Sequence, residues 1–287
     1  MVDCSSYQKM NPISYFPTPP KEEEIEEVQS DELHFCAPTV FGYSFMTKMW
    51  GQLIADKFTP IHWNKHAFEH LVLPQPTKQL IKSLLDTDRA DSGVINDVVT
   101  GKGGGCVIIL HGRPGTGKTL TAEAIAENCE KPLIMISAAE LATNARELES
   151  RLTDILEISK VWNAILLLDE AEVFLEARSL HDLHRNAMVA VFLRLLEYHQ
   201  RFMFLTTNQI SHLDDAFKSR ISIAIKYKDL DQSARREIWR SFLDMASVKV
   251  MDHASNSTDN VAMITKDQVN RLASKRLNGR LYLCVPS

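Results

Sequence analysis

The chain has 287 residues, 45% of them hydrophobic and 24% charged, which is enough for one large core and a smaller second unit. Its 32 Lys and Arg residues are outnumbered by 37 Asp and Glu, so the net charge of −5 carries no strong nucleic-acid signal. Five scattered cysteines without a C-x-x-C pair indicate a reducing compartment. No apolar run approaches the roughly 20 residues of a membrane span, and no signal or transit pattern opens the chain. We therefore expect a soluble intracellular protein, in cytoplasm or nucleus.

The first part of the chain predicts a flexible acidic tail over residues 1–35. Four prolines and an acidic run over residues 21–27 leave little apolar surface to bury. Aromatic residues return over residues 36–74, which predicts a short β-rich linker before the main unit. The function of that linker is not readable from its residues.

Two groups of histidines raise the question of a metal site. His62, His66 and His70 are spaced four apart, so on one helix they would share a face and could hold a metal. An ordinary half-buried linker explains them as well, because no known metal motif surrounds them. His181 and His184 fall between two helical patterns and are typical of a loop or helix cap. We predict no metal site at either group.

After the glycine-rich bridge of residues 101–105, apolar runs of strand length alternate with longer helical patterns. This alternation predicts a parallel sheet covered by helices on both faces. Two further helices, Gln232–Ala246 and Lys266–Arg276, predict a small helical lid. The alternating segments are Cys106–Leu110, Leu120–Cys129, Leu133–Ile136, Leu148–Val161, Ile165–Leu168, Ala187–Tyr198 and Phe202–Leu205.

Residues Gly112–Thr119 match the phosphate-loop pattern G-x-x-x-x-G-K-[ST], between a predicted strand and a predicted helix. Glycines allow backbone amides to close around phosphate, and the positive helix end faces the anion. Lys118 would supply a charge to the β and γ oxygens, and Thr119 would coordinate Mg²⁺. A plain glycine-rich turn is the alternative. The pattern predicts a three-layer α/β/α P-loop NTPase with a five-stranded parallel sheet.

The apolar strand Ile165–Leu168 ends in two carboxylates, Asp169 and Glu170, which form a Walker B pattern. Parallel sheets place their ligands at this end of the strands. Asp169 would hold Mg²⁺, and Glu170 would orient and polarise the attacking water. Taken alone, such a pair is also typical of a strand that ends in a solvated turn.

The segment Asp169–Phe174 (DEAEVF) resembles that of AAA+ ATPases, and residues 75–280 as a whole are similar to fungal AAA-domain proteins. The resemblance implies that Asn208, after the strand Phe202–Leu205, is a sensor 1 residue that orients the lytic water. An Asn after a strand also starts turns readily. The resemblance divides the chain into a tail (1–35), a linker (36–74), an AAA+ core (75–228) and a partial lid (229–287).

Two arginines complete the resemblance. Arg220 matches the arginine finger that reaches a neighbouring subunit's nucleotide, although a single arginine replaces the usual two and a strand-edge cap is the alternative. Arg280 matches the sensor 2 residue, beside a glycine that could equally end a helix. The implied catalytic residues are therefore Glu170, Asn208 and Arg220. The implied nucleotide contacts are Gly112, Pro114, Gly115, Thr116, Gly117, Lys118, Thr119, Leu120 and Arg280, with Thr119 and Asp169 as Mg²⁺ ligands.

The resemblance implies a Mg²⁺-dependent ATPase that assembles with copies of itself into a ring such as a hexamer and remodels a protein or nucleoprotein partner. Residues 138–160 contain no Phe, Tyr or Trp, which argues against threading by an aromatic pore loop. Only seven residues follow Arg280, too few for a three-turn helix, so we expect a truncated C-terminus.

Two other functions compete with this prediction. The first is an ATP-binding scaffold with little hydrolysis, in which the nucleotide orders the lid for docking. The second is a small-molecule kinase that uses the same phosphate loop. A kinase rarely needs the Asp169–Glu170 pair, Asn208 and Arg220 together, which disfavours it.

Overall fold

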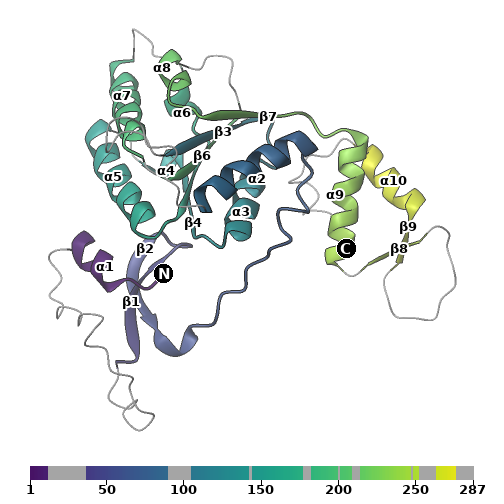
Figure 1. The fold of residues 1–287 in the computed structure, drawn as a ribbon, viewed down its shortest axis with the longest axis horizontal. Helices are drawn as coiled ribbons and strands as arrows, with labels where there is room; N and C mark the ends of the chain where they lie inside the picture. Colours follow the sequence, from purple (N-terminus) through teal and green to yellow (C-terminus); the bar gives the residue numbers. More distant parts are fainter. Residues whose placement is uncertain are drawn as a thin grey trace. The chain divides into compact units, whose positions relative to one another are not determined.

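The computed structural model describes residues 1–11, 37–89, 105–141, 144–176, 182–199, 201–208, 214–246, 248–251 and 263–275 (Figure 1). The chain divides into two compact units, Met1–His62 and Trp63–Ser287. No helix in the described residues has the length and apolar character needed to cross a bilayer.

In the first unit, the described residues form a β-hairpin, a short α-helix and a 3₁₀ helix. Strands β1 (Thr39–Ser44) and β2 (Met49–Ile54) pair antiparallel, and the 3₁₀ helix η3 (Ala55–Lys57) follows them. Helix α1 (Cys4–Met10) lies within the segment for which composition predicts a flexible tail. The Asp3 side chain accepts a hydrogen bond from the Ser6 amide, and the Tyr7 ring stacks on Phe41 at 4.7 Å. Residues 12–36, which hold the prolines and the acidic run, lie outside the described residues.

The second unit contains the predicted five-stranded parallel sheet, in the order β4-β5-β6-β3-β7. Adjacent strands pair in parallel register, with Ile109 opposite Leu205 and Leu168 opposite Leu205 on its other side. The strands are β3 (Cys106–Gly112), β4 (Leu133–Ser137), β5 (Ile165–Asp169), β6 (Phe202–Thr207) and β7 (Ile223–Tyr227). The fold class predicted from the alternating segments is therefore confirmed.

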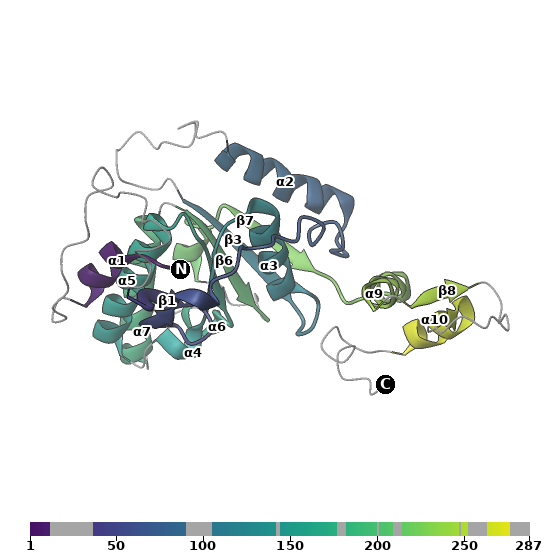
Figure 2. The ribbon, with the colours of Figure 1, turned by 90° about the horizontal axis from the view of Figure 1, so that it is seen from below.

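Helices cover both faces of this sheet (Figures 1 and 2). On one face, Ile125 of α3 and Ile81 of α2 join a buried cluster with strand residues such as Leu167 and Phe204. On the other face lie α5 and α7, whose Leu152 and Phe192 are fully buried. The described helices that precede β7 in this unit are α2 (Gln75–Arg89), α3 (Lys118–Cys129), α4 (Ala138–Leu141), α5 (Ala145–Val161), α6 (Glu172–Leu175), α7 (Leu183–Glu197) and α8 (Asp215–Lys218).

The packed unit begins before residue 75, where sequence places the start of the core. Phe68 and Leu71 are buried in the same cluster as Ile81 of α2. The histidine segment before α2 forms successive turns over residues 65–70, and His66 contacts Glu69 whereas His70 contacts Ser241. Within the described residues no three His, Cys, Asp or Glu side chains gather as metal ligands.

The predicted lid helices are present as α9 (Gln232–Met245) and α10 (Lys266–Ser274). They enclose a small core of Trp239, Val269 and Ala273. Two short strands absent from the prediction, β8 (Lys249–Met251) and β9 (Met263–Thr265), pair in parallel beside them. Thr265 begins α10 with a reciprocal capping box to Gln268, which stabilises the first turn. Residues 276–287, including Arg280, lie outside the described residues.

A buried histidine next to the sheet makes stability depend on pH. His199 follows α7 and is 3% exposed, and burial lowers its pKa from 6.5 to about 4. The unfolded chain accepts a proton near pH 6.5 that the folded chain resists. The free energy of unfolding should therefore fall as pH drops from 6.5 to 4, by on the order of 3 kcal/mol.

Denaturant titrations of wild type and His199→Gln between pH 7 and pH 4 measure this contribution. The difference in the free energy of unfolding between wild type and His199→Gln should narrow or reverse toward low pH, because the glutamine side chain does not titrate. Curves that stay parallel across this range would contradict a neutral, buried imidazole at position 199.

Candidate functional site at the carboxyl edge of the sheet

The candidate site lies where β3, β5 and β6 end at one edge of the sheet. Because the three strands are parallel, their last residues Gly112, Asp169 and Thr207 face the same edge. Ligands of open α/β sheets bind at this edge. The predicted phosphate loop connects β3 to α3 at this point.

Glycines shape the loop at two positions. Gly112 has a φ of 155°, and a Cβ there would lie 2.5 Å from the Tyr227 carbonyl oxygen on neighbouring β7. Gly117 has a φ of 95° and precedes the first residue of α3. A side chain at either position would strain the turn that points the N-terminus of α3 into the loop. The Thr116 hydroxyl donates back to the Arg113 carbonyl at 2.8 Å, which closes the loop further.

Lys118 is a buried charge beneath this loop, with only 8% of its surface exposed. Its Nζ donates to the carbonyl oxygens of Gly112 (2.7 Å) and Arg113 (3.0 Å) and to the Asn208 Oδ1 (3.0 Å). The ammonium therefore joins the loop to the end of β6. Burial, Lys226 and Lys118 lower the pKa of nearby His111, which favours its neutral form.

Asn208 is held in one orientation by two partners of opposite kind. Its Nδ2 donates to the Glu172 Oε1 at 2.8 Å, while its Oδ1 accepts from Lys118. Lysine can only donate and a carboxylate can only accept, so the amide oxygen must face Lys118. The sequence assigns Asn208 and Glu170 to the same attacking water, but it does not identify Glu172 as a hydrogen-bond partner of Asn208.

Asp169 lies between two threonine hydroxyls from different elements. Thr119 Oγ1 is 3.4 Å from its Oδ2 and 3.5 Å from its Oδ1, and Thr206 Oγ1 donates to Oδ1. Burial and the charge of Asp169 raise the pKa of Glu123, which lies one turn after Thr119 on α3. Hydroxyl and carboxylate oxygens next to concentrated negative charge fit a hard divalent cation such as Mg²⁺. The structure thus brings Thr119 and Asp169 together at this edge.

Glu170 adopts a backbone conformation that non-glycine residues rarely use, with a φ of 57°. Its amide donates to the Thr206 hydroxyl at 3.1 Å, and the Ala171 amide donates to the Thr206 carbonyl at 2.9 Å. Such a conformation costs on the order of 1–3 kcal/mol and occurs where surrounding contacts impose it, often at functional sites.

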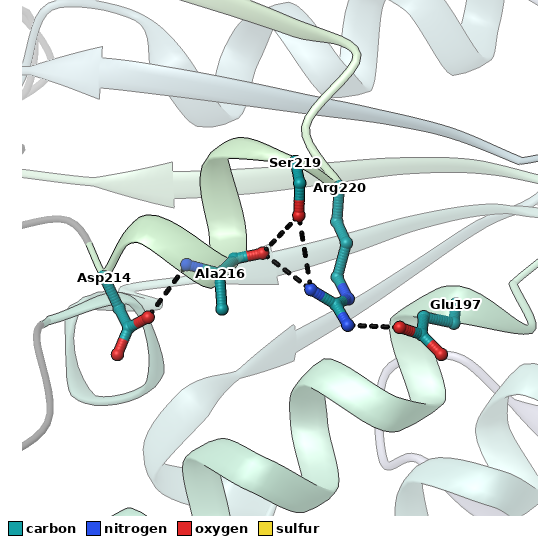
Figure 3. Close-up of polar contacts among 5 residues, drawn as sticks. All are labelled: Glu197, Asp214, Ala216, Ser219 and Arg220. Carbon is teal, nitrogen blue, oxygen red and sulfur yellow. Dashed lines mark hydrogen bonds and ion pairs between the residues drawn. The ribbon is translucent and has the colours of Figure 1, made fainter.

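Arg220 makes its contacts at the end of α7 and at α8 (Figure 3). Its guanidinium forms an ion pair with Glu197 at the end of α7 and donates to the Ala216 carbonyl oxygen at 2.8 Å. Asp214 caps the same short helix α8 by accepting from the Ala216 amide at 2.9 Å. In this single chain Arg220 therefore connects the end of α7 to the short helix α8. The exposed side chains of Pro114 and Leu120 lie in and just after the loop.

Sequence reasoning missed Thr206, Glu172 and Glu123 at this edge. Thr206 carried a readable signal, because it continues the alternation Phe202, Phe204 on the strand face that contacts α3. The contact between Glu172 and Asn208 depends on the position of the turn after β5 relative to the end of β6. A local sequence pattern does not specify that position.

A parallel α/β/α unit with such a loop defines a class of nucleotide-binding domains, and comparison with known proteins shows which of them this chain is similar to. Residues 108–229 match the model of the ATPase family associated with various cellular activities (AAA). The AAA domain-containing protein 3B of Homo sapiens is 31% identical over 136 residues, which cover 45% of this chain and 21% of that protein. The 3A homolog of Drosophila melanogaster is 27% identical over 143 residues, 48% of this chain and 24% of that protein.

The fold comparison agrees with the sequence comparison. The AAA domain of FIGL-1 superposes with a TM-score of 0.52 at 18% identity, covering 67% of this chain and 65% of that domain. The chain therefore contains a region that is similar to AAA domains in sequence and has the AAA-domain fold. The match spans less than a quarter of the length of each of these two curated relatives.

Proposed function

We propose that this chain binds ATP with Mg²⁺ at the carboxyl edge of the sheet and hydrolyses it. The observation that carries the proposal is the convergence of Lys118 and Thr119, at the start of α3, with Asp169, at the end of β5, around one loop. Phosphoryl transfer requires a positively charged hydrogen-bond donor, a hydroxyl and a carboxylate around the triphosphate.

Each residue has a distinct role in this proposal. Amides of the loop and the N-terminus of α3 bind the phosphates, and Lys118 turns from its carbonyl partners toward the β and γ oxygens. Thr119 and Asp169 hold Mg²⁺, which neutralises phosphate charge when bound. Glu170 accepts the proton of the attacking water, and Asn208 orients that water. Leu120 and Pro114 line the nucleotide, and the family resemblance adds Arg280, which lies outside the described residues.

Assembly with copies of the chain belongs to the proposal. Arg220 would leave Glu197 and reach the γ-phosphate of a neighbouring subunit, so that an isolated subunit turns over slowly. The partner to be remodelled would be a protein or nucleoprotein. An ATP-binding scaffold with little hydrolysis is the second candidate, and the ion pair of Arg220 with Glu197 within one chain favours it.

The roles of Lys118 and Glu170 predict opposite effects of two substitutions. Lys118→Ala should weaken ATP binding at least about 10–100-fold, because charge-assisted hydrogen bonds contribute about 1.5–3 kcal/mol. Glu170→Gln should keep ATP binding and lower kcat by about 10²–10⁴-fold, the usual contribution of a general base. Equilibrium binding of ATP and release of inorganic phosphate measure the two effects. Unchanged hydrolysis in both variants would end the enzymatic proposal, and binding without measurable wild-type hydrolysis would favour the scaffold.

A role for Arg220 in trans predicts that ATPase rate per subunit rises steeply with protein concentration. Arg220→Ala should abolish this rise and lower the rate at high concentration by on the order of 10³-fold, as for other arginine fingers, without changing ATP affinity. Glu197→Gln should move the rise to lower concentration, because the guanidinium no longer leaves a partly buried ion pair.

Lys218→Ala is the matched control, because Lys218 is an exposed cation at the end of α8, two residues before Arg220. It should keep the wild-type concentration dependence. A steep rise that persists in Arg220→Ala, together with a lowered melting temperature, would instead establish Arg220 as a structural cap.

A further inference from the structure

Thr206 occupies a position in β6 at which a purely structural strand would bury an apolar side chain. Its residue is 1% exposed, and Phe202 and Phe204 precede it on the same face of the strand. Leu168 of β5 pairs with Leu205, so Asp169 and Thr206 follow as the next neighbours across the two strands. Asp169 continues the β5 face of Ile165 and Leu167, which contacts the same cluster. The strand register thus places a buried hydroxyl beside the carboxylate.

Three hydrogen bonds connect Thr206 to the end of β5. Its hydroxyl donates to the Asp169 Oδ1 and accepts from the Glu170 amide at 3.1 Å. Its carbonyl oxygen accepts from the Ala171 amide at 2.9 Å. The hydroxyl has one proton to donate and here gives it to a carboxylate, which accepts stronger hydrogen bonds than a neutral group does. A valine would fill the same space and keep only the backbone contact.

The two side-chain contacts act on different parts of the proposed site. The bond to Oδ1 restrains the Asp169 carboxylate, whose Oδ2 lies 3.4 Å from the Thr119 hydroxyl. The bond from the Glu170 amide stabilises the left-handed conformation at that residue, which sets the direction of its side chain. One hydroxyl therefore orients both the proposed metal ligand and the proposed general base.

We propose that Thr206 is a positioning residue that fixes Asp169 for Mg²⁺ and Glu170 for water activation. This inference rests on the proposed function and adds a residue to it. Residues that hydrogen-bond metal ligands typically change metal affinity or activity by about 10–100-fold when replaced. Replacing the Thr206 hydroxyl should change the Mg²⁺ dependence of nucleotide binding. It should not change ATP binding to the phosphate loop in the absence of metal.

The test compares Thr206→Val, which keeps the branched shape, with Thr206→Ser, which keeps the hydroxyl. Thr206→Ala is a second hydroxyl-free variant, in case valine does not fit. Thr207→Val is the matched control, because Thr207 is equally buried in the same strand but points to the opposite face. Each full-length variant is titrated with ATP in EDTA and then across Mg²⁺ concentrations, and steady-state kcat and KM are measured.

In Thr206→Val and Thr206→Ala, the Mg²⁺ concentration for half-maximal enhancement of ATP binding should rise about 10–100-fold. Affinity in EDTA should stay within about twofold of wild type, and kcat should fall more than KM changes. Thr206→Ser should restore wild-type values, and Thr207→Val should leave the Mg²⁺ dependence unchanged. Thermal melting of each variant separates these effects from a general loss of stability.

Several outcomes would overturn the inference. Unchanged Mg²⁺ dependence in both hydroxyl-free variants would show that Thr206 is only a packing residue. An equal shift in Thr206→Ser or in Thr207→Val would show that the strand, rather than the hydroxyl, matters. A wild-type chain that binds no ATP in either condition would instead remove the proposed function itself, which keeps the two failures distinct.

Discussion

The parallel register of β3, β5 and β6 is the constraint on which the rest of the site depends. It brings the loop at the end of β3, the carboxylates after β5 and the amide after β6 to one edge of the sheet. The buried side chains of Lys118 and Thr206 have polar partners there: Lys118 donates to carbonyl oxygens and to Asn208, and Thr206 donates to Asp169. Charges that are removed from water require such partners, so the edge is organised before any ligand binds. Preorganised groups of this kind can stabilise developing charge without the cost of reorienting solvent.

The same edge carries both signs of charge in separate places. The Lys118 ammonium lies under the loop, whereas Asp169 and Glu123 concentrate negative charge beyond Thr119. A triphosphate with a divalent cation has the complementary distribution, with anionic oxygens next to a metal. Arg220 differs from these residues because its carboxylate partner, Glu197, lies at the end of α7 (Figure 3). An arginine that is satisfied within its own chain must exchange one carboxylate partner for another if it is to serve a neighbour.

Residue type and spacing predicted the parallel sheet, the phosphate loop after its first strand, and the position of two carboxylates at the end of another strand. Each of these predictions depends on a local sequence pattern. The run Ile165–Leu168 reads as a buried strand by itself, and Gly112–Thr119 combines a local motif with a strand before it and a helix after it. The roles of Thr206 and Glu172 could not be read in the same way, since both depend on the neighbour across the sheet. Thr206 becomes meaningful only when the register sets it beside Asp169.

Other differences have equally specific causes. The average composition of residues 1–35 did not predict the seven-residue helix α1. Asp3 caps this helix, and the Tyr7 ring stacks on Phe41. The spacing of His62, His66 and His70 suggested a shared face only if the segment were one helix, and it forms turns instead. The parallel pair β8–β9 consists of two three-residue strands, shorter than any periodic pattern can identify.

Amide hydrogen exchange with and without Mg²⁺-ATP tests most directly whether this edge of the sheet is the nucleotide site. Exchange should slow at residues 112–119 and at the turn after Asp169, because the loop amides would bind phosphate and the metal ligands would be ordered. The small core between α9 and α10, which contributes no residue to this edge, should exchange in its interior at its original rate. Unchanged exchange across the loop at a saturating ATP concentration would contradict a triphosphate site there.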